Sequence, residues 1–301
     1  MYTNVEFPSE GVNLRGRYYL PKNKNTKPAI VIMGHGFSAT ITGMTADKYA
    51  ESFYNAGFAV LLYDHKSFGE SEGDPRHEIN PWVQARGYID AIEFIMKLPE
   101  IDTTKIAIWG DSYSASMSIM VGSIDKRVKA IALQVPGCGS DRPPPDPDGS
   151  KFEAIKDTLL HADLSSRESV VGPILVVSPD QIGNLSALKT ITAFRWFIEY
   201  GGRFETKWEN QITDVNPKPS IPYHPGMCAS HIDVPLLMVI SPDDEITGAE
   251  AEISRLVYNL VQGPKEWFEI EGGHFGLNYY PSPIFDQASK AEINFLKKYL
   301  I

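Results

Sequence analysis

The sequence is dominated by an alternation between short apolar runs and longer amphipathic stretches. The apolar runs, for example 29–33 and 235–240, contain no charged residue, which is typical of strands buried on both faces of a sheet. The stretches between them carry apolar residues at helical spacing. Strands that alternate with helices predict an α/β fold with a mostly parallel, doubly wound sheet. Because the crossovers are right-handed, the loops that follow the strands are expected at one edge of that sheet.

The expected elements follow from these two periods. We predict strands over 14–20, 29–34, 59–64, 106–109, 128–134, 236–241 and 267–271. We predict helices over 45–55, 81–97, 112–123, 249–260 and 283–299. A chain of 301 residues suits two units of about 150 residues, or one α/β domain that carries an insertion.

The alternation stops between residue 136 and about residue 230. This stretch has Pro-rich segments at 142–147 and 216–226, where helices and central strands are excluded, and helix-like segments at 152–161 and 186–200. We therefore predict a core formed by 1–135 and 231–301, and a helical cap formed by 136–230. The Pro-rich ends favour a lid, and an extension without a function is the alternative.

The strongest local signal is the segment Gly110-Asp111-Ser112-Tyr113-Ser114, which joins a predicted strand to a predicted helix. A serine in such a turn is held outward on strained backbone, and the helix behind it supplies amide donors. The standard pattern has a second glycine where this chain has Ser114, and serine is small enough to fill that place. The alternative is that Ser112 only caps the helix.

A second signal lies at the end of the strand over 29–34, where Gly34-His35-Gly36-Phe37 follows. Acyl-transfer chemistry needs two backbone donors for the oxyanion, and glycines let the chain approach a substrate closely. We assign the amides of Phe37 and Tyr113 to that oxyanion hole. His35 is interpreted as a structural residue of the loop.

Two further loops carry an acid and a histidine. Asp243 and Asp244 follow the strand over 236–241, and either carboxylate could orient a histidine. We prefer Asp244, because Glu245-Ile246 follow it in a pattern typical of the acid in such enzymes, and Asp243 would then cap the turn. His274 follows the next strand, and glycines on both sides of it would let its loop lean over the end of the sheet.

The order of these residues indicates their chemistry. Ser112, Asp244 and His274 follow three different strands, and this is the order of the α/β-hydrolase triad. The chain resembles an α/β-hydrolase over nearly its whole length, with the cap between nucleophile and acid segments. Segments 11–16 and 64–73, and Tyr113 after the serine, are similar to the dienelactone hydrolase and X-prolyl dipeptidyl peptidase-like branch, which includes polyketide acyltransferases.

The resemblance implies acyl transfer through a serine. The predicted enzyme is a serine hydrolase that cleaves a small ester, lactone or thioester through an acyl-enzyme. An acyltransferase with the same triad and a non-water acceptor is the first alternative. An aminopeptidase-like enzyme would need an acidic cluster near the pocket, and a non-catalytic binding module has no use for all three residues.

Aromatic residues in the predicted cap suggest the kind of acyl group. Phe194, Phe197 and Trp208 are candidate substrate contacts, because a pocket forms where a lid meets its core. Simple packing of these aromatic residues is the alternative. We expect an apolar or aromatic acyl part in a small-molecule substrate.

Several classes of partner are not expected. With 28 Lys and Arg against 38 Asp and Glu, the chain has a net charge of −10 and lacks the basic footprint of nucleic-acid binding. No run reaches the roughly 18 apolar residues of a membrane span, and no signal peptide is visible, so we expect a cytoplasmic location. The histidines lack zinc-site spacing, and we predict neither a metal nor another cofactor. Cys138 and Cys228 are expected as free thiols, although they could pair, and a homodimer is one option for the assembly.

Overall fold

The computed structural model describes residues 1–22, 26–218, 221 and 223–301, and within these residues the strands form two sheets. The large sheet has eight described strands: β1 (Thr3–Ser9), β2 (Val12–Tyr19), β3 (Ile30–Gly34), β4 (Ala59–Tyr63), β6 (Ile106–Asp111), β7 (Val128–Gln134), β11 (Leu236–Ile240) and β12 (Lys265–Glu269). The small sheet has four: β5 (Glu78–Ile79), β8 (Arg167–Val177), β9 (Ser186–Leu188) and β10 (Ile212–Pro217). The helices of the described part are α1 (Ala46–Asn55), α2 (Pro81–Ile95), α3 (Tyr113–Ile124), α4 (Ser150–His161), α5 (Ile191–Gly201), α6 (Pro225–Ala229), α7 (Ala251–Leu260), α8 (Gly273–Gly276) and α9 (Pro283–Leu300).

The large sheet has the order β1-β2-β4-β3-β6-β7-β11-β12. Strands β1 and β4 both pair antiparallel with β2, and the other pairings from β4 to β12 are parallel. Only β2 therefore runs against the other strands of this sheet. The predicted mostly parallel α/β sheet is confirmed.

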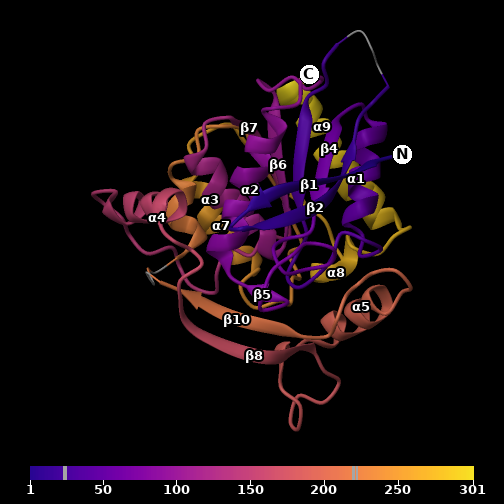
Figure 1. Ribbon diagram of the computed structural model, residues 1–301, viewed down its shortest axis with the longest axis vertical. Coiled ribbons are helices and arrows are strands. Elements are labelled where there is room, and N and C mark those ends of the chain that lie inside the picture. The colour runs from indigo at the N-terminus through magenta and orange to yellow at the C-terminus, as the bar shows by residue number, and fades with distance from the viewer. Residues whose placement is uncertain (23–25, 219–220, 222) are drawn as a thin grey trace.

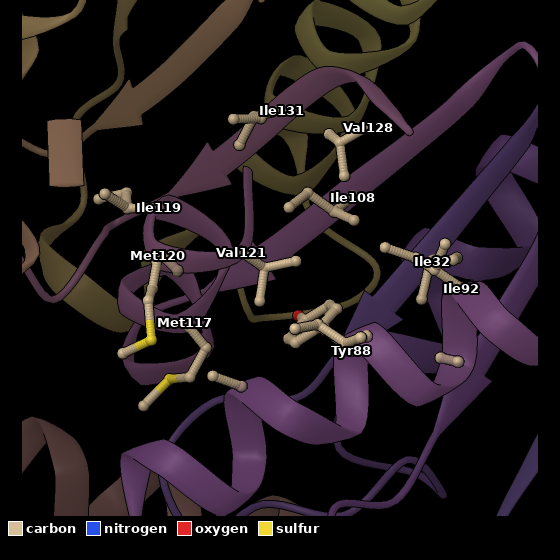
Figure 2. Close-up of a cluster of buried hydrophobic side chains, with 14 of the residues drawn as sticks. Ile32, Tyr88, Ile92, Ile108, Met117, Ile119, Met120, Val121, Val128 and Ile131 are labelled. Atoms are coloured by element: carbon tan, nitrogen blue, oxygen red, sulfur yellow. The ribbon is translucent and has the colours of Figure 1, made fainter. Parts of the chain in front are cut away.

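The core consists of two apolar layers, one on each face of the large sheet. Alternate residues of a strand face opposite sides, so Ile32 of β3 packs under α2 and α3 while Met33 packs toward α1 and α9. Figure 2 shows the first layer, in which Val121 of α3 lies between Ile108 of the sheet and Tyr88 of α2. Because both faces are covered, the central strands are continuous apolar runs, as the sequence predicts.

Residues 136–230, called the insert below, lie between β7 and β11 and are divided between two places. Helices α4 and α6 pack on α2, α3 and α7 and share their apolar layer. Strands β8 and β10 run along the lower side of the molecule in Figure 1, with α5 beside them. The insert is thus not only helical. The helix predicted over 186–200 is replaced at its start by β9, and α5 begins after Thr190, whose hydroxyl accepts a hydrogen bond from the amide of Ala193.

Two further sequence predictions can be placed. Cys138 and Cys228 are both buried and free, as expected. In the second Pro-rich segment, Pro219, Ser220 and Pro222 lie outside the described residues. No helix in the described part of the chain is both long and apolar enough to span a membrane.

Candidate active site

Ser112 occupies the sharp turn between β6 and α3. Its backbone has φ 55° and ψ −112°, a conformation that non-glycine residues rarely adopt. Gly110 makes this turn possible, because a Cβ there would lie 2.6 Å from the Cα of Ala115. The turn is fixed from both sides, since the Ser112 amide donates to the carbonyl of Gln134 and its carbonyl accepts from the amide of Gly137.

Ser114 stands where the standard pattern has glycine, and its hydroxyl holds the turn. The Ser114 Oγ accepts a hydrogen bond of 2.9 Å from the amide of Asp111 and donates one of 2.9 Å to the carbonyl of Gly34. The side chain is fully buried. Serine at this position therefore ties the β6–α3 turn to the neighbouring strand β3.

Three side chains from separate loops meet in one hydrogen-bonded chain. The Nδ1 of His274 lies 2.7 Å from the Oδ2 of Asp244, and its Nε2 lies 2.8 Å from the Oγ of Ser112. An ionised carboxylate can only accept, so Nδ1 carries the proton and Nε2 accepts from the Ser112 hydroxyl. A serine activated by such an imidazole is able to attack a carbonyl carbon.

The loop that carries Asp244 also separates the roles of the two neighbouring acids. The Oδ1 of Asp244 accepts from the amide of Ile246, which leaves Oδ2 for His274. Asp243 does not contact the imidazole, and instead accepts hydrogen bonds from the hydroxyl of Ser241 and the amide of Gly273. This arrangement favours Asp244 as the partner of His274.

Electrostatics keep the imidazole basic although it is buried. Burial alone would lower the pKa of His274, but the Asp244 carboxylate, with smaller contributions from Asp111 and Glu245, raises this pKa above its ordinary value of 6.5. For Asp244, burial raises the pKa, and the hydrogen bonds from His274 and Ile246 oppose that rise. The Asp244 carboxylate therefore makes the imidazole a better acceptor for the proton of Ser112.

Ser112 and His274 line a cavity of about 600 Å³, and Asp244 lies behind the imidazole. Phe37 and Tyr113 both line it, and their rings meet edge-to-face at 5.6 Å. The amide N–H groups of these two residues donate no hydrogen bond among the described residues. Gly36 brings its loop close to the turn, because a Cβ there would lie 3.5 Å from the Cβ of Ser112.

Several known proteins are similar to this chain over most of its length. A family model described as X-Pro dipeptidyl-peptidase (S15 family) matches residues 10–142. The thiohydrolase aneE of Aspergillus aculeatus is 30% identical, and the match covers 99% of this chain and 94% of that protein. The acyltransferase drtE of Aspergillus calidoustus is 24% identical, over 99% of this chain and 95% of its own. The crystal structure of the alpha/beta hydrolase GrgF from Penicillium sp. sh18 matches with a TM-score of 0.75 at 23% identity, and covers 100% of this chain and 99% of the other.

The chain belongs to the α/β-hydrolase superfamily. It lies in the X-prolyl dipeptidyl peptidase-like branch, together with thiohydrolases and acyltransferases, so the predicted resemblance is confirmed. This α/β-hydrolase is an enzyme.

Of the three aromatic residues that the sequence suggested for substrate contact, one lines the cavity and two do not. Phe197 of α5 lines the cavity of this α/β-hydrolase. Trp208 stacks on Phe197 with ring centres 5.5 Å apart, and Phe194 packs at the edge of the same apolar cluster, but neither belongs to the cavity lining. Trp196, which the sequence analysis did not select, does line the cavity.

Glu245 is a functional candidate that sequence reasoning missed. One carboxylate oxygen accepts a 2.9 Å hydrogen bond from the amide of His274, and the other accepts one from the hydroxyl of Thr192 in α5. Gly273 permits this approach, because a Cβ there would lie 2.7 Å from the Glu245 carboxylate. Its position directly after Asp244 was the only signal, and the contact with α5 cannot be seen in the sequence.

Two carboxylates in the lining were also missed. Asp111 ends β6 and accepts a 2.8 Å hydrogen bond from the side-chain amide of Gln134. Asp214 belongs to β10 of the insert. Among the residues that the structure describes, no group of three or more His, Cys, Asp or Glu side chains is arranged to hold a metal ion.

Proposed function

We propose that this enzyme is a serine hydrolase that cleaves a small ester or thioester through Ser112, His274 and Asp244. The observation that carries the proposal is the hydrogen-bonded chain from Asp244 to Ser112, with distances of 2.7 Å and 2.8 Å, at the wall of one cavity. The 30% identical relative is named a thiohydrolase, which supports a thioester as substrate.

The proposed reaction has two steps. His274 takes the proton of Ser112 as the Oγ attacks the acyl carbon, and Asp244 stabilises the resulting imidazolium. The amides of Phe37 and Tyr113 hold the oxyanion. The bond to the leaving alcohol or thiol breaks, and His274 returns the proton to that group. A water molecule then gives a proton to His274 and attacks the acyl-enzyme. The bond from the acyl carbon to Oγ breaks, His274 returns the proton to Ser112, and the acid is released.

The cavity supports an apolar or aromatic acyl part in a small-molecule substrate. Its lining includes Trp196 and Phe197 from the insert, and Phe37 and Phe275 from the rest of the chain. Because the insert supplies one wall, we propose that residues 136–230 act as the cap of a core formed by 1–135 and 231–301. Burial of the acyl group between cap and core would then provide most of the binding energy.

A fluorophosphonate tests the nucleophile directly. Intact-mass analysis should find one adduct on the wild type and none on Ser112→Ala, while Ser116→Ala, which removes a hydroxyl of α3 that also lines the cavity, should still be labelled. Ser112→Ala should lower turnover of a thioester by about 10³-fold or more. Labelling of folded Ser112→Ala, or a loss of turnover under tenfold, would remove Ser112 from this role.

An acyltransferase is the second candidate, and the 24% identical relative named as an acyltransferase favours it. The same acyl-enzyme would then react with an alcohol or amine in place of water. Product analysis with and without such acceptors distinguishes the two functions. A hydrolase gives mainly the free acid in both samples, whereas a transferase gives mainly the acylated acceptor when one is supplied.

A further inference from the structure

The cavity lining contains two acidic side chains. Besides His274, the charged side chains that line it are Asp111 and Asp214, and no lysine or arginine of the described chain belongs to the lining. The rest of the lining is largely apolar, so little solvent would separate a bound acyl group from these carboxylates. Two charges inside such a cavity interact more strongly than two charges on the surface, because the effective dielectric constant is lower there.

Strand β10 directs Asp214 into the cavity. Ile212 and Asp214 are two residues apart, so they lie on the same face of the strand, and both line the cavity. Thr213 lies on the other face, where its hydroxyl donates to the carbonyl of Arg76. The neighbouring strands are consistent with this orientation, because Asp214 pairs with Ile79 of β5 and Ile79 also lines the cavity.

Asp214 lines the same cavity as the proposed nucleophile. Its carboxylate accepts no hydrogen bond from any side chain or from the backbone outside the sheet ladders, as far as the described residues go. Together with burial, it raises the pKa of the Tyr113 phenol, and Tyr113 is the residue next to Ser112. Asp111, in contrast, is held by the side-chain amide of Gln134. Asp214 is therefore the carboxylate that remains available to a ligand.

We propose that the cavity takes an acyl group with a hydroxyl that donates a hydrogen bond to Asp214, and that it excludes acyl groups with a carboxylate. The inference rests on the proposed serine hydrolase function and adds its substrate class. A hydroxyl would satisfy the Asp214 carboxylate, and a charge-assisted hydrogen bond of this kind is among the stronger ones. A carboxylate on the acyl group would meet like charge with no cation in the lining to offset it.

The test uses para-nitrophenyl esters in matched sets of equal chain length, ending in a methyl, a hydroxymethyl or a carboxylate group. For the wild type, kcat/KM should be about tenfold or more lower for the carboxylate than for the methyl ester at the best chain length. The hydroxyl ester should equal or exceed the methyl ester. In Asp214→Asn, the penalty for the carboxylate should shrink about tenfold relative to the methyl ester, and Asp214→Lys should reverse the preference.

Glu168→Gln provides the matched control, because Glu168 is an exposed acid on β8 of the same small sheet and does not line the cavity. This variant should keep the wild-type ratio of the esters. Equal turnover of carboxylate and methyl esters by the wild type, or a ratio that Asp214→Asn leaves unchanged, would overturn the inference while the hydrolase function stands. If no ester is turned over in a Ser112-dependent way, the proposed function fails and this inference fails with it.

Discussion

His274 lies between the hydroxyl of Ser112 and the carboxylate of Asp244. Its Nε2 must accept a proton from Ser112, and the Asp244 carboxylate on its other side makes it a stronger base. The imidazole is nearly fully buried, so without that carboxylate its pKa would fall. The Asp244 carboxylate therefore both orients the imidazole and makes it more basic.

This arrangement predicts a particular pH profile. Activity needs neutral His274, so kcat/KM should fall as the pH drops through the raised pKa of His274, above its ordinary value of 6.5. Asp244→Asn removes the main stabilisation of the protonated imidazole. It should lower kcat by about 10³- to 10⁴-fold and shift the acid limb to lower pH. Steady-state kinetics from pH 5 to pH 9 measure both effects.

Asp243→Asn is the matched control for that experiment. Asp243 lies next in the chain and binds Ser241 and Gly273, but not the imidazole. Its substitution should change kcat by less than about tenfold and leave the acid limb in place. A larger loss for Asp243→Asn than for Asp244→Asn would assign the acid to Asp243.

At the scale of elements, hydrogen bonds and an aromatic contact connect α5 of the insert to the segment that carries His274. Thr192 binds Glu245, which in turn holds the His274 amide, and the indole of Trp196 donates to the carbonyl of Asn278. Trp196 also stacks on Phe275, with ring centres 5.3 Å apart. The insert thus contributes to the position of the proposed general base as well as to the cavity wall.

Glu245 should therefore act as a positioning residue. Glu245→Ala removes both hydrogen bonds, and we expect kcat to fall about 10- to 100-fold with a smaller change in KM, because a small displacement of the base is costly. Glu245→Gln keeps an acceptor for the His274 amide and should restore most of kcat. Because the Glu245 charge also raises the pKa of His274, the acid limb of Glu245→Gln should move slightly to lower pH.

Two variants test whether this effect passes through α5. Thr192→Val removes only the link to the insert and should reproduce part of the loss in kcat. Glu252→Ala changes an exposed acid of α7 and should behave as the wild type. A Glu245→Ala enzyme with unchanged kcat and an unchanged rate of fluorophosphonate labelling would show that Glu245 has no positioning role.

The elements differ in how well the sequence predicted them, and the reason is physical. Strand β4 was predicted to within one residue of its observed bounds, because a strand buried on both faces is a continuous apolar run. Strand β1 was missed because it lies at the edge of the sheet and only Phe7 and Ser9 are buried. Strand β8 was missed because most of it is exposed and Gly172-Pro173 interrupts its pattern, so it depends on pairing with β10, which follows much later in the chain.

The residues of the candidate site also differ in whether the sequence could predict them. Ser112, Asp244 and His274 could be proposed from sequence because each follows a strand, and parallel strands end at one edge. Glu245 and Asp214 could not, because their importance depends on which part of the insert packs opposite them. Thr192 and Glu245 are 53 residues apart, and nothing in the intervening sequence specifies their contact.

At the scale of the whole molecule, a buried acid joins the C-terminal helix to the strand that leads to Ser112. The indole of Trp109 in β6 donates a 2.9 Å hydrogen bond to Glu292 of α9, which is fully buried. The other carboxylate oxygen of Glu292 has no hydrogen-bond partner among the described residues. Burial raises the pKa of Glu292 to about 8, so this side chain is mainly protonated in the folded protein at neutral pH.

The raised pKa of Glu292 makes the stability of the fold depend on pH in a defined direction. In the unfolded chain Glu292 would lose its proton near its ordinary pKa of 4.5, whereas the folded protein keeps that proton up to about pH 8. Its contribution to the free energy of unfolding, on the order of 5 kcal/mol, is therefore complete well below pH 4.5 and is lost as the pH rises toward 8. Glu292→Gln keeps an acceptor for Trp109 but has no proton to lose, so its stability should change less over this range.

Urea denaturation of the wild type and Glu292→Gln at pH 5, 6.5 and 8 measures this difference. The variant should gain stability relative to the wild type as the pH rises, and Asp286→Asn, which changes an exposed acid on the same helix, should not. A constant difference between wild type and Glu292→Gln at all three pH values would mean that Glu292 does not titrate in this range. The proton on Glu292 would then have no part in holding α9 against the strand that carries the turn at Ser112.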